Sequence, residues 1–154
     1  MADARIVANR FLELARKKGR SLTPMQLLKL VYIAHGWMLG LTGRPLINQK
    51  VEAWQYGPVI RDVYNSTRGY GRNPITAPIT GMSGELMSDE ADMVGQVFDL
   101  YGKMDGISLS NITHMPDTPW ANTYRPGSFG KVIDNSLIAS HYRRLAAERA
   151  ETSQ

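Results

Sequence analysis

A strong helix start followed by a segment that is apolar on nearly every side constrains this fold more than any other feature. Thr23, Pro24 and Gln26 match the N-cap, N1 and N3 positions of a capping box, so a helix is predicted over about residues 24–41. Its polar interruptions are few: Gln26, Lys29 and His35. A helix that is apolar all round is buried, and it is therefore expected to be the central core helix.

Gly36 and Gly40 lie four residues apart on this helix, which would allow another element to approach it closely. Helical spacing of apolar residues, together with capping residues, predicts further helices. Three of these helices are predicted over about residues 4–17, 58–68 and 136–149. Two more are predicted to begin at Ser88 and Ser108, and a single helical turn is predicted at Trp120. The irregular segment 72–87 is expected to be a mobile or partner-contacting loop.

A small β element is predicted beside the central helix. Leu46-Ile47 and Val51–Trp54 flank a short polar turn, which indicates a two-stranded ribbon over about residues 46–54. The chain length of 154 residues suits one core. The predicted fold is therefore mainly α: a compact single-domain helical bundle around the central helix, with domain limits 1–154 and an ordered core of about 4–149.

Large rings and a Gly-Pro pair follow the ribbon. Gly57-Pro58 is predicted to be a rigid connector into the next helix, which Pro58 would begin. The rings of Trp54 and Tyr56 are expected to pack on the central helix. The alternative is that one of them lines a groove open to a partner.

Composition and charge exclude several classes of protein. There is no cysteine, which excludes disulfides and thiolate zinc sites, and no apolar run is long enough to span a membrane. The N-terminus does not resemble a signal peptide, so a cytoplasmic protein is expected. Residues 1–72 hold 12 basic and 4 acidic side chains, whereas residues 73–105 hold 1 and 6. Such polarity can steer association with a charged partner, although solvated helix faces would give the same counts.

No catalytic or metal-binding motif is present in the sequence. The histidines His35, His114 and His141 lie on different predicted elements, so no metal site and no cofactor are expected. Ser108, Ser110, His114 and Asp117 could be drawn as a hydrolase triad, but helix capping accounts for the first and the last. The ring of His114 is instead expected to bond a backbone carbonyl and to fix the turn before Trp120. The protein is not predicted to be an enzyme.

Binding of DNA is a separate possibility, because the sequence pI is about 9.5. The first two predicted helices superficially suit a helix-turn-helix motif, but the second is too apolar to lie in a groove of DNA. Arginines of the last helix could contact phosphates: Arg143, Arg144 and Arg149. A nucleic-acid-binding, phage-associated regulator is therefore kept as the alternative function.

Several ordered blocks of the sequence resemble the Panacea antitoxin domain, also met in SocA-like and phage-associated GepA-like proteins. The blocks are Leu22–Tyr32, Ala34–Trp37, Thr42–Leu46, Glu52–Val59, Tyr101-Gly102, Leu109–His114 and Pro119-Trp120. The resemblance covers residues 5 to about 145. Departures are small, with His35 where the family would have Gln and Met38 where it would have a polar residue or His.

The resemblance implies a mainly helical antitoxin of a bacterial or prophage toxin–antitoxin system, with no cofactor and no catalytic role. Such a protein would neutralise a cognate protein toxin by direct binding. A SocA-like member would act as an adaptor that delivers the toxin to a cytosolic ATP-dependent protease. Candidate partner-binding residues are Trp54, Tyr56, Pro58, Arg61, Tyr70, His114 and Trp120.

Overall fold

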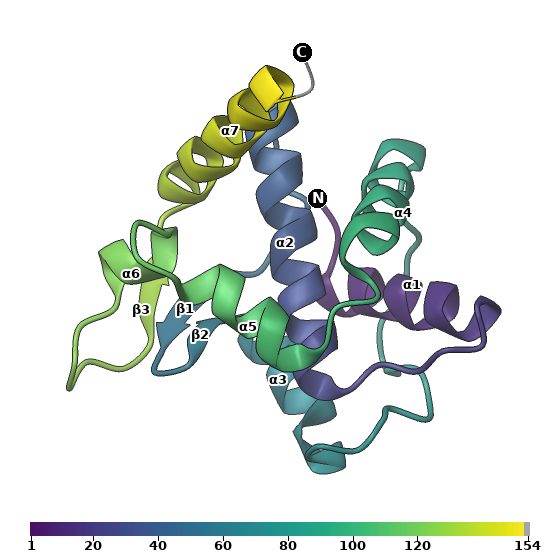
Figure 1. Ribbon diagram of the computed structural model, residues 1–154. Coiled ribbons are helices and arrows are strands. Elements are labelled where there is room, and N and C mark those ends of the chain that lie inside the picture. Colours follow the sequence, from purple (N-terminus) through teal and green to yellow (C-terminus); the bar gives the residue numbers. More distant parts are fainter. Residues whose placement is uncertain (153–154) are drawn as a thin grey trace.

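The central position of helix α2 (Pro24–Thr42) dominates the computed structural model of the protein, which describes residues 1–152 (Figure 1). All residues from Leu27 to Leu39 are buried. At its start, the Thr23 hydroxyl accepts the backbone N–H of Gln26, and the Gln26 side chain accepts the backbone N–H of Thr23. The capping box and the buried central helix predicted from the sequence are both confirmed.

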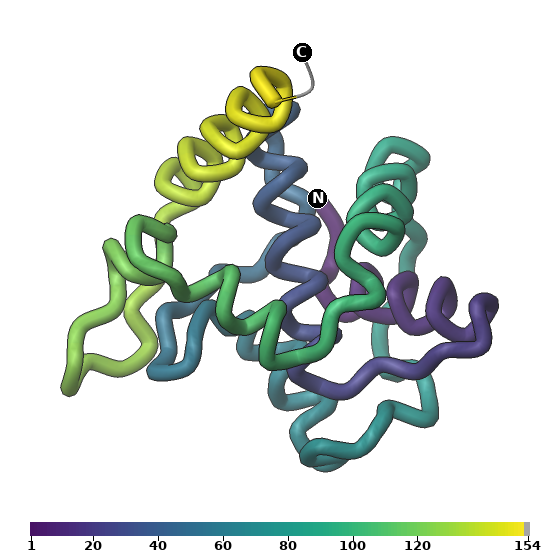
Figure 2. The backbone as a smooth tube through the Cα atoms, in the orientation of Figure 1, coloured from purple at the N-terminus to yellow at the C-terminus, as the bar shows by residue number. Residues whose placement is uncertain are grey.

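Other helices surround α2, and the fold is mainly α as predicted (Figures 1 and 2). Those that contact it most are α7 (Asn135–Thr152), α5 (Gly106–His114), α1 (Ala4–Lys17) and α4 (Ser88–Tyr101). Shorter elements complete the shell: α3 (Arg61–Thr67), the 3₁₀ turn η1 (Arg68–Tyr70) and α6 (Pro119–Thr123). The buried apolar side chains form one continuous cluster.

The close approach that the paired glycines of α2 allow is made by α7. A Cβ atom placed on Gly40 would lie 2.6 Å from the Cβ atom of Tyr142, and one placed on Gly36 would overlap the Tyr142 ring. The same ring packs edge-on against Trp37, with ring centroids 5.1 Å apart. Glycine at positions 36 and 40 is therefore what allows α7 to seat its buried tyrosine directly on α2.

The small β element is an antiparallel sheet in the order β2-β1-β3. Its strands are β1 (Val51–Trp54), β2 (Gly57–Val59) and β3 (Lys131–Ile133). The segment Leu46-Ile47 does not pair with β1 as expected, because Ile47 instead forms an isolated parallel bridge with Ala2. The true partners of β1 are the strand that follows it at once and a strand from the far end of the chain.

Two predicted helix starts are displaced in the structure. Pro58 lies in β2 and does not begin a helix, because Gln55-Tyr56 form a tight hairpin turn and Gly57 adopts a φ of +122°. Helix α3 begins only at Arg61. Helix α5 begins at Gly106 rather than at Ser108, because Asp105 caps it by accepting the Ser108 backbone N–H.

Two ion pairs join the segment 1–72 to acidic side chains of the segment 73–105. Arg44 pairs with Asp89 at 2.6 Å, and the Met1 amine pairs with the buried Glu90 at 3.2 Å.

The irregular segment 72–87 is tied to α1, because Asn9 exchanges two hydrogen bonds of 2.8 Å with the backbone of Ile79. Within residues 1–152, no helix is long and apolar enough to cross a membrane.

Candidate functional site

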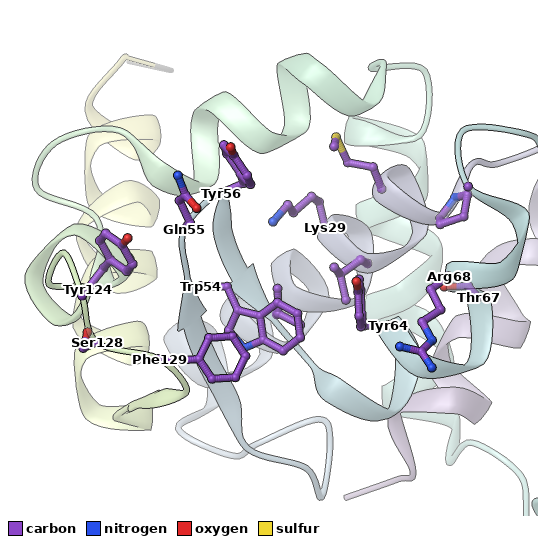
Figure 3. Close-up of a pocket in the computed structure, with 16 residues that line it drawn as sticks. Lys29, Trp54, Gln55, Tyr56, Tyr64, Thr67, Arg68, Tyr124, Ser128 and Phe129 are labelled. Carbon is purple, nitrogen blue, oxygen red and sulfur yellow. The ribbon is translucent and has the colours of Figure 1, made fainter.

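A groove of about 710 Å³ opens between the first half of α2, the β1–β2 hairpin, α3 with η1, and the loop 124–129 (Figure 3). Its walls are rich in aromatic and other apolar side chains. The lining residues are Pro24, Met25, Leu28, Lys29, Trp54, Gln55, Tyr56, Val59, Tyr64, Thr67, Arg68, Gly71, Tyr124, Gly127, Ser128 and Phe129. Such a concave apolar surface with a few polar groups is typical of a binding site.

One wall of the groove is a cluster of rings around Trp54. Its ring lies 4.8 Å from that of Tyr64 in an edge-on arrangement and 5.1 Å from that of Phe129, measured between centroids. Phe129 is 70% exposed and Tyr56, on the hairpin turn, is 72% exposed. Exposed large rings beside a groove are the residue type that most often anchors a protein partner.

Arg61 packs on this aromatic wall. Its guanidinium lies over the rings of Trp54 and Phe129, at 5.4 and 5.7 Å from their centroids. It also donates two hydrogen bonds to the carboxylate of Glu52 on β1, at 2.6 and 3.1 Å. These hydrogen bonds from Arg61 lower the pKa of Glu52. The hairpin and α3 are therefore joined through one arginine at the outer edge of the groove.

Lys29 lies in the floor of the groove with 3% of its surface exposed. Its amine donates one hydrogen bond, 3.0 Å long, to the carbonyl oxygen of Pro58. Burial lowers the pKa of Lys29 to about 8. Within the described part of the chain, no carboxylate forms an ion pair with it. Figure 3 shows the amine pointing toward the hairpin that carries Tyr56.

The hairpin is braced from behind by α5 and α6. The indole N–H of Trp120 donates a 2.5 Å hydrogen bond to the carbonyl oxygen of Trp54. The hydroxyl of Ser110 donates to the carbonyl oxygen of Tyr56 at 3.2 Å and also lies 3.3 Å from His114 Nδ1. The backbone of the turn is thus held on both sides of Gln55, so the aromatic rings are presented on a fixed loop.

His114 differs from its predicted role in one respect. The sequence predicted a bond from its ring to a backbone carbonyl, but in the structure the ring bonds the hydroxyl of Ser110. The two residues are four apart on α5 and therefore share a face, a spacing that was visible in the sequence. Ser110 is 7% exposed and directed at the backbone of Tyr56, so this pair acts as a structural clamp on the hairpin.

The structure brings most of the predicted partner-binding residues to one place. Trp54 and Tyr56 line the groove, Pro58 accepts the Lys29 hydrogen bond, and Arg61 covers the rings. His114 and Trp120 brace the hairpin from the other side and do not line the groove. Tyr70 ends η1 and is not a lining residue either.

Several residues of the groove were not identified from the sequence as site residues: Lys29, Tyr64, Arg68, Tyr124 and Phe129. A lysine inside an otherwise apolar helix was a usable signal, because an unpaired buried charge is costly and rare. Phe129 carried no such signal, since only the pairing of β3 with β1 brings its loop to Trp54.

The histidines lie apart, on α2, α5 and α7. Among residues 1–152, no group of three or more His, Cys, Asp or Glu side chains is placed to hold a metal ion. His35 has an internal role: its Nδ1 accepts the backbone N–H of Leu46 at 3.2 Å, and its Nε2 donates to Asn135 at 3.1 Å. Burial lowers the pKa of His35 to about 4.

Comparison with known proteins places this fold in a family. Residues 27–121, which include most of α2 and the braced hairpin, match the family model described as antitoxin SocA-like, Panacea domain. The chain is 32% identical over 128 residues to antitoxin SocA of Caulobacter vibrioides (strain NA1000 / CB15N). The aligned region covers 77% of this chain and 68% of that relative. No solved structure matches the chain. The chain therefore belongs to the SocA-like antitoxin family that carries the Panacea domain.

Proposed function

We propose that this protein neutralises a cognate toxin in the cytoplasm by binding it directly, and that the groove beside the β1–β2 hairpin is where the toxin docks. Family membership supports the antitoxin role. The observation that carries the choice of surface is the pair of exposed rings, Tyr56 and Phe129, at 72% and 70% exposure on the rim of a groove. Rings of this kind bury a large apolar area with little loss of side-chain entropy.

The rigidity of the hairpin favours tight binding. Hydrogen bonds from Trp120 and Ser110 hold the turn, and Arg61 holds the ring cluster. A surface that is already ordered loses little conformational entropy when a partner docks, so more of the contact energy appears as affinity. A typical stable interface buries about 1,200–2,000 Å² in total, which is more surface than a single groove provides. The toxin would therefore also contact surfaces around it.

Toxin binding is the shared first step of two modes of neutralisation. In the first, the antitoxin covers the functional surface of the toxin. In the second, it acts as an adaptor that carries the bound toxin to an ATP-dependent protease. The alternative function as a nucleic-acid-binding regulator gains no support from helix geometry, because α2 is buried from Leu27 to Leu39 and cannot enter a groove of DNA.

A growth-rescue experiment tests this proposal. The product of the adjacent gene is expressed as the candidate toxin, together with the wild-type chain, the groove variant Y56A/F129A or the control variant L100A. Leu100 is 65% exposed on α4 and lies outside the groove, so L100A removes exposed apolar surface without touching the site. We expect wild type and L100A to restore growth and the groove variant to fail, since loss of two anchor rings weakens binding about 30-fold or more.

Rescue by the groove variant at the level of wild type would show that the toxin docks elsewhere. If the adjacent gene is harmless when expressed alone, its product is not the toxin. Circular dichroism of the purified variants checks that each is folded, which both exposed positions are expected to permit.

A further inference from the structure

We infer that the groove recognises a toxin segment in which an acidic side chain, Asp or Glu, lies between apolar residues, and that its carboxylate pairs with the amine of Lys29. This inference rests on the proposed docking of a toxin in the groove. It adds the chemistry of the docked segment, which family membership does not specify. The supporting observations are the state of Lys29, the sign of the charges along the groove, and the arrangement of the rings around the amine.

Lys29 is an incompletely satisfied cation. An ammonium group has three N–H donors, and the described residues offer it one acceptor, the carbonyl oxygen of Pro58 at 3.0 Å. Only 3% of the residue is exposed, so bulk water solvates it poorly. A buried charge without a counter-ion is unfavourable, and the lowered pKa of Lys29 reflects the same burial. A carboxylate from a partner would supply the missing charge and acceptors.

The charge of the groove has one sign. Its lining side chains include the basic Lys29 and Arg68 and no Asp or Glu. Glu52 on β1 is not a lining residue, and its carboxylate accepts hydrogen bonds from the Trp54 indole and from Arg61. A peptide with a basic side chain would therefore meet repulsion in the groove, whereas an acidic one would be attracted. Electrostatic complementarity of this kind chooses between partners as well as adding affinity.

The hairpin passes close to the amine because residue 57 has no side chain. A Cβ atom placed on Gly57 would lie 2.8 Å from Lys29 Nζ, so any larger residue there would press on the ammonium group. Gly57 also adopts a φ of +122°, a backbone conformation that disfavours other residues. The glycine thus serves both the turn and the close approach of the hairpin to the amine.

The rings around Lys29 indicate an acidic side chain within a segment rather than a terminal carboxylate. In Figure 3, Lys29 lies between Tyr56 on one side and Trp54 and Tyr64 on the other. Apolar surface is therefore available both before and after the position that meets the amine. A chain terminus would leave one of these two surfaces unused.

Binding measurements with substitutions on both proteins test this inference. The affinity of the purified candidate toxin is measured for wild type, for K29M and for the control K103M. Lys103 is an exposed lysine in the turn between α4 and α5, outside the groove. Methionine keeps the length of the side chain and removes its charge. We expect K29M to bind about 30-fold more weakly or worse, because the toxin carboxylate is left buried without a partner, and K103M to bind as wild type does.

The acidic residues of the toxin are then changed one at a time to Asn or Gln. One of them is expected to reproduce the loss, and its combination with K29M should weaken binding no further, which is the signature of a direct pair. Wild-type affinity of K29M, combined with loss in Y56A/F129A, would overturn the carboxylate inference and leave the docking groove intact. Loss in K29M without coupling to any toxin carboxylate would also overturn it. Wild-type affinity of both variants would overturn the docking groove itself.

Discussion

Tyr142 of α7 packs directly on Gly40 of α2, so closely that a Cβ atom on residue 40 would lie 2.9 Å from the Tyr142 carbonyl carbon. The contact involves backbone as well as side-chain atoms, and a rotamer change of the tyrosine cannot relieve it. We expect G40A to lower the free energy of unfolding by about 1–3 kcal/mol, as overpacking of a core typically does. Urea denaturation of the variant measures the change.

Gly95 provides the matched control for that substitution. It lies within α4, and apart from the adjoining helix backbone no atom lies within 4 Å of a Cβ atom placed on it. G95A should therefore raise the free energy of unfolding by about 0.5–1 kcal/mol through helix propensity alone. Equal effects of the two substitutions would contradict the close packing of α7 on α2.

His35 is expected to make the protein sensitive to acid. Its pKa is about 4 in the folded protein, against an ordinary value of 6.5, so the unfolded chain binds more protons between these values. Stability from this group is complete above pH 6.5 and is lost as pH falls toward 4. Between pH 7 and 4.5 it contributes a loss of about 2 kcal/mol.

The variant H35Q tests that assignment. The amide oxygen of Gln can accept the Leu46 N–H and its nitrogen can donate to Asn135, as the two ring nitrogens of His35 do. Carboxylates titrate equally in both proteins, so the difference between their stability curves isolates residue 35. That difference should change by about 2 kcal/mol over the same pH range, and parallel curves would show that His35 is not buried in its neutral form.

Lys29 is expected to make the free energy of unfolding depend on pH in the alkaline range. Its pKa is about 8 in the folded protein and 10.5 ordinarily, so the unfolded chain binds more protons between those values. Stability should therefore rise with pH, by about 2 kcal/mol from pH 8 to 10 relative to K29M. Urea denaturation of both proteins at pH 8, 9 and 10 measures the slope. A constant difference would mean that the amine is solvated.

The same substitution separates stability from binding. At pH 7 the buried charge of Lys29 lowers stability, so K29M should unfold at the same or a higher urea concentration than wild type despite its lost hydrogen bond to Pro58. A variant that is as stable as wild type but fails to bind toxin would mark Lys29 as a residue kept for recognition. A large loss of stability in K29M at pH 7 would contradict this role.

Features set by neighbouring residues could be predicted from the sequence. The capping pattern at Thr23 predicted the start of α2, and the spacing of Gly36 and Gly40 indicated that another element could approach it closely. Which element makes that approach depends on contacts about 100 residues apart in the chain, and spacing alone carries no information about them. The same limit explains why Ile47 was paired with β1 in the prediction rather than with Ala2.

The groove was predicted only in part for a related reason. Trp54 and Tyr56 are conspicuous, because large rings beside a Gly-Pro pair suggest a specific local structure. The opposite part of the groove comes from the loop 124–129, which reaches Trp54 only after β3 pairs with β1. Lys29 was present in the sequence as an interruption of an apolar helix, but its importance depends on burial and on the carbonyl of Pro58.

The most direct test of the central claim is amide hydrogen exchange of the full chain with and without the purified toxin. If the toxin docks in the groove, exchange should slow at residues 54–60 of the hairpin, across 61–71 and in the loop 124–129, while the exposed face of α4 keeps its rate. Unchanged exchange at the hairpin and at 124–129, with protection confined to α4 or α7, would contradict the claim.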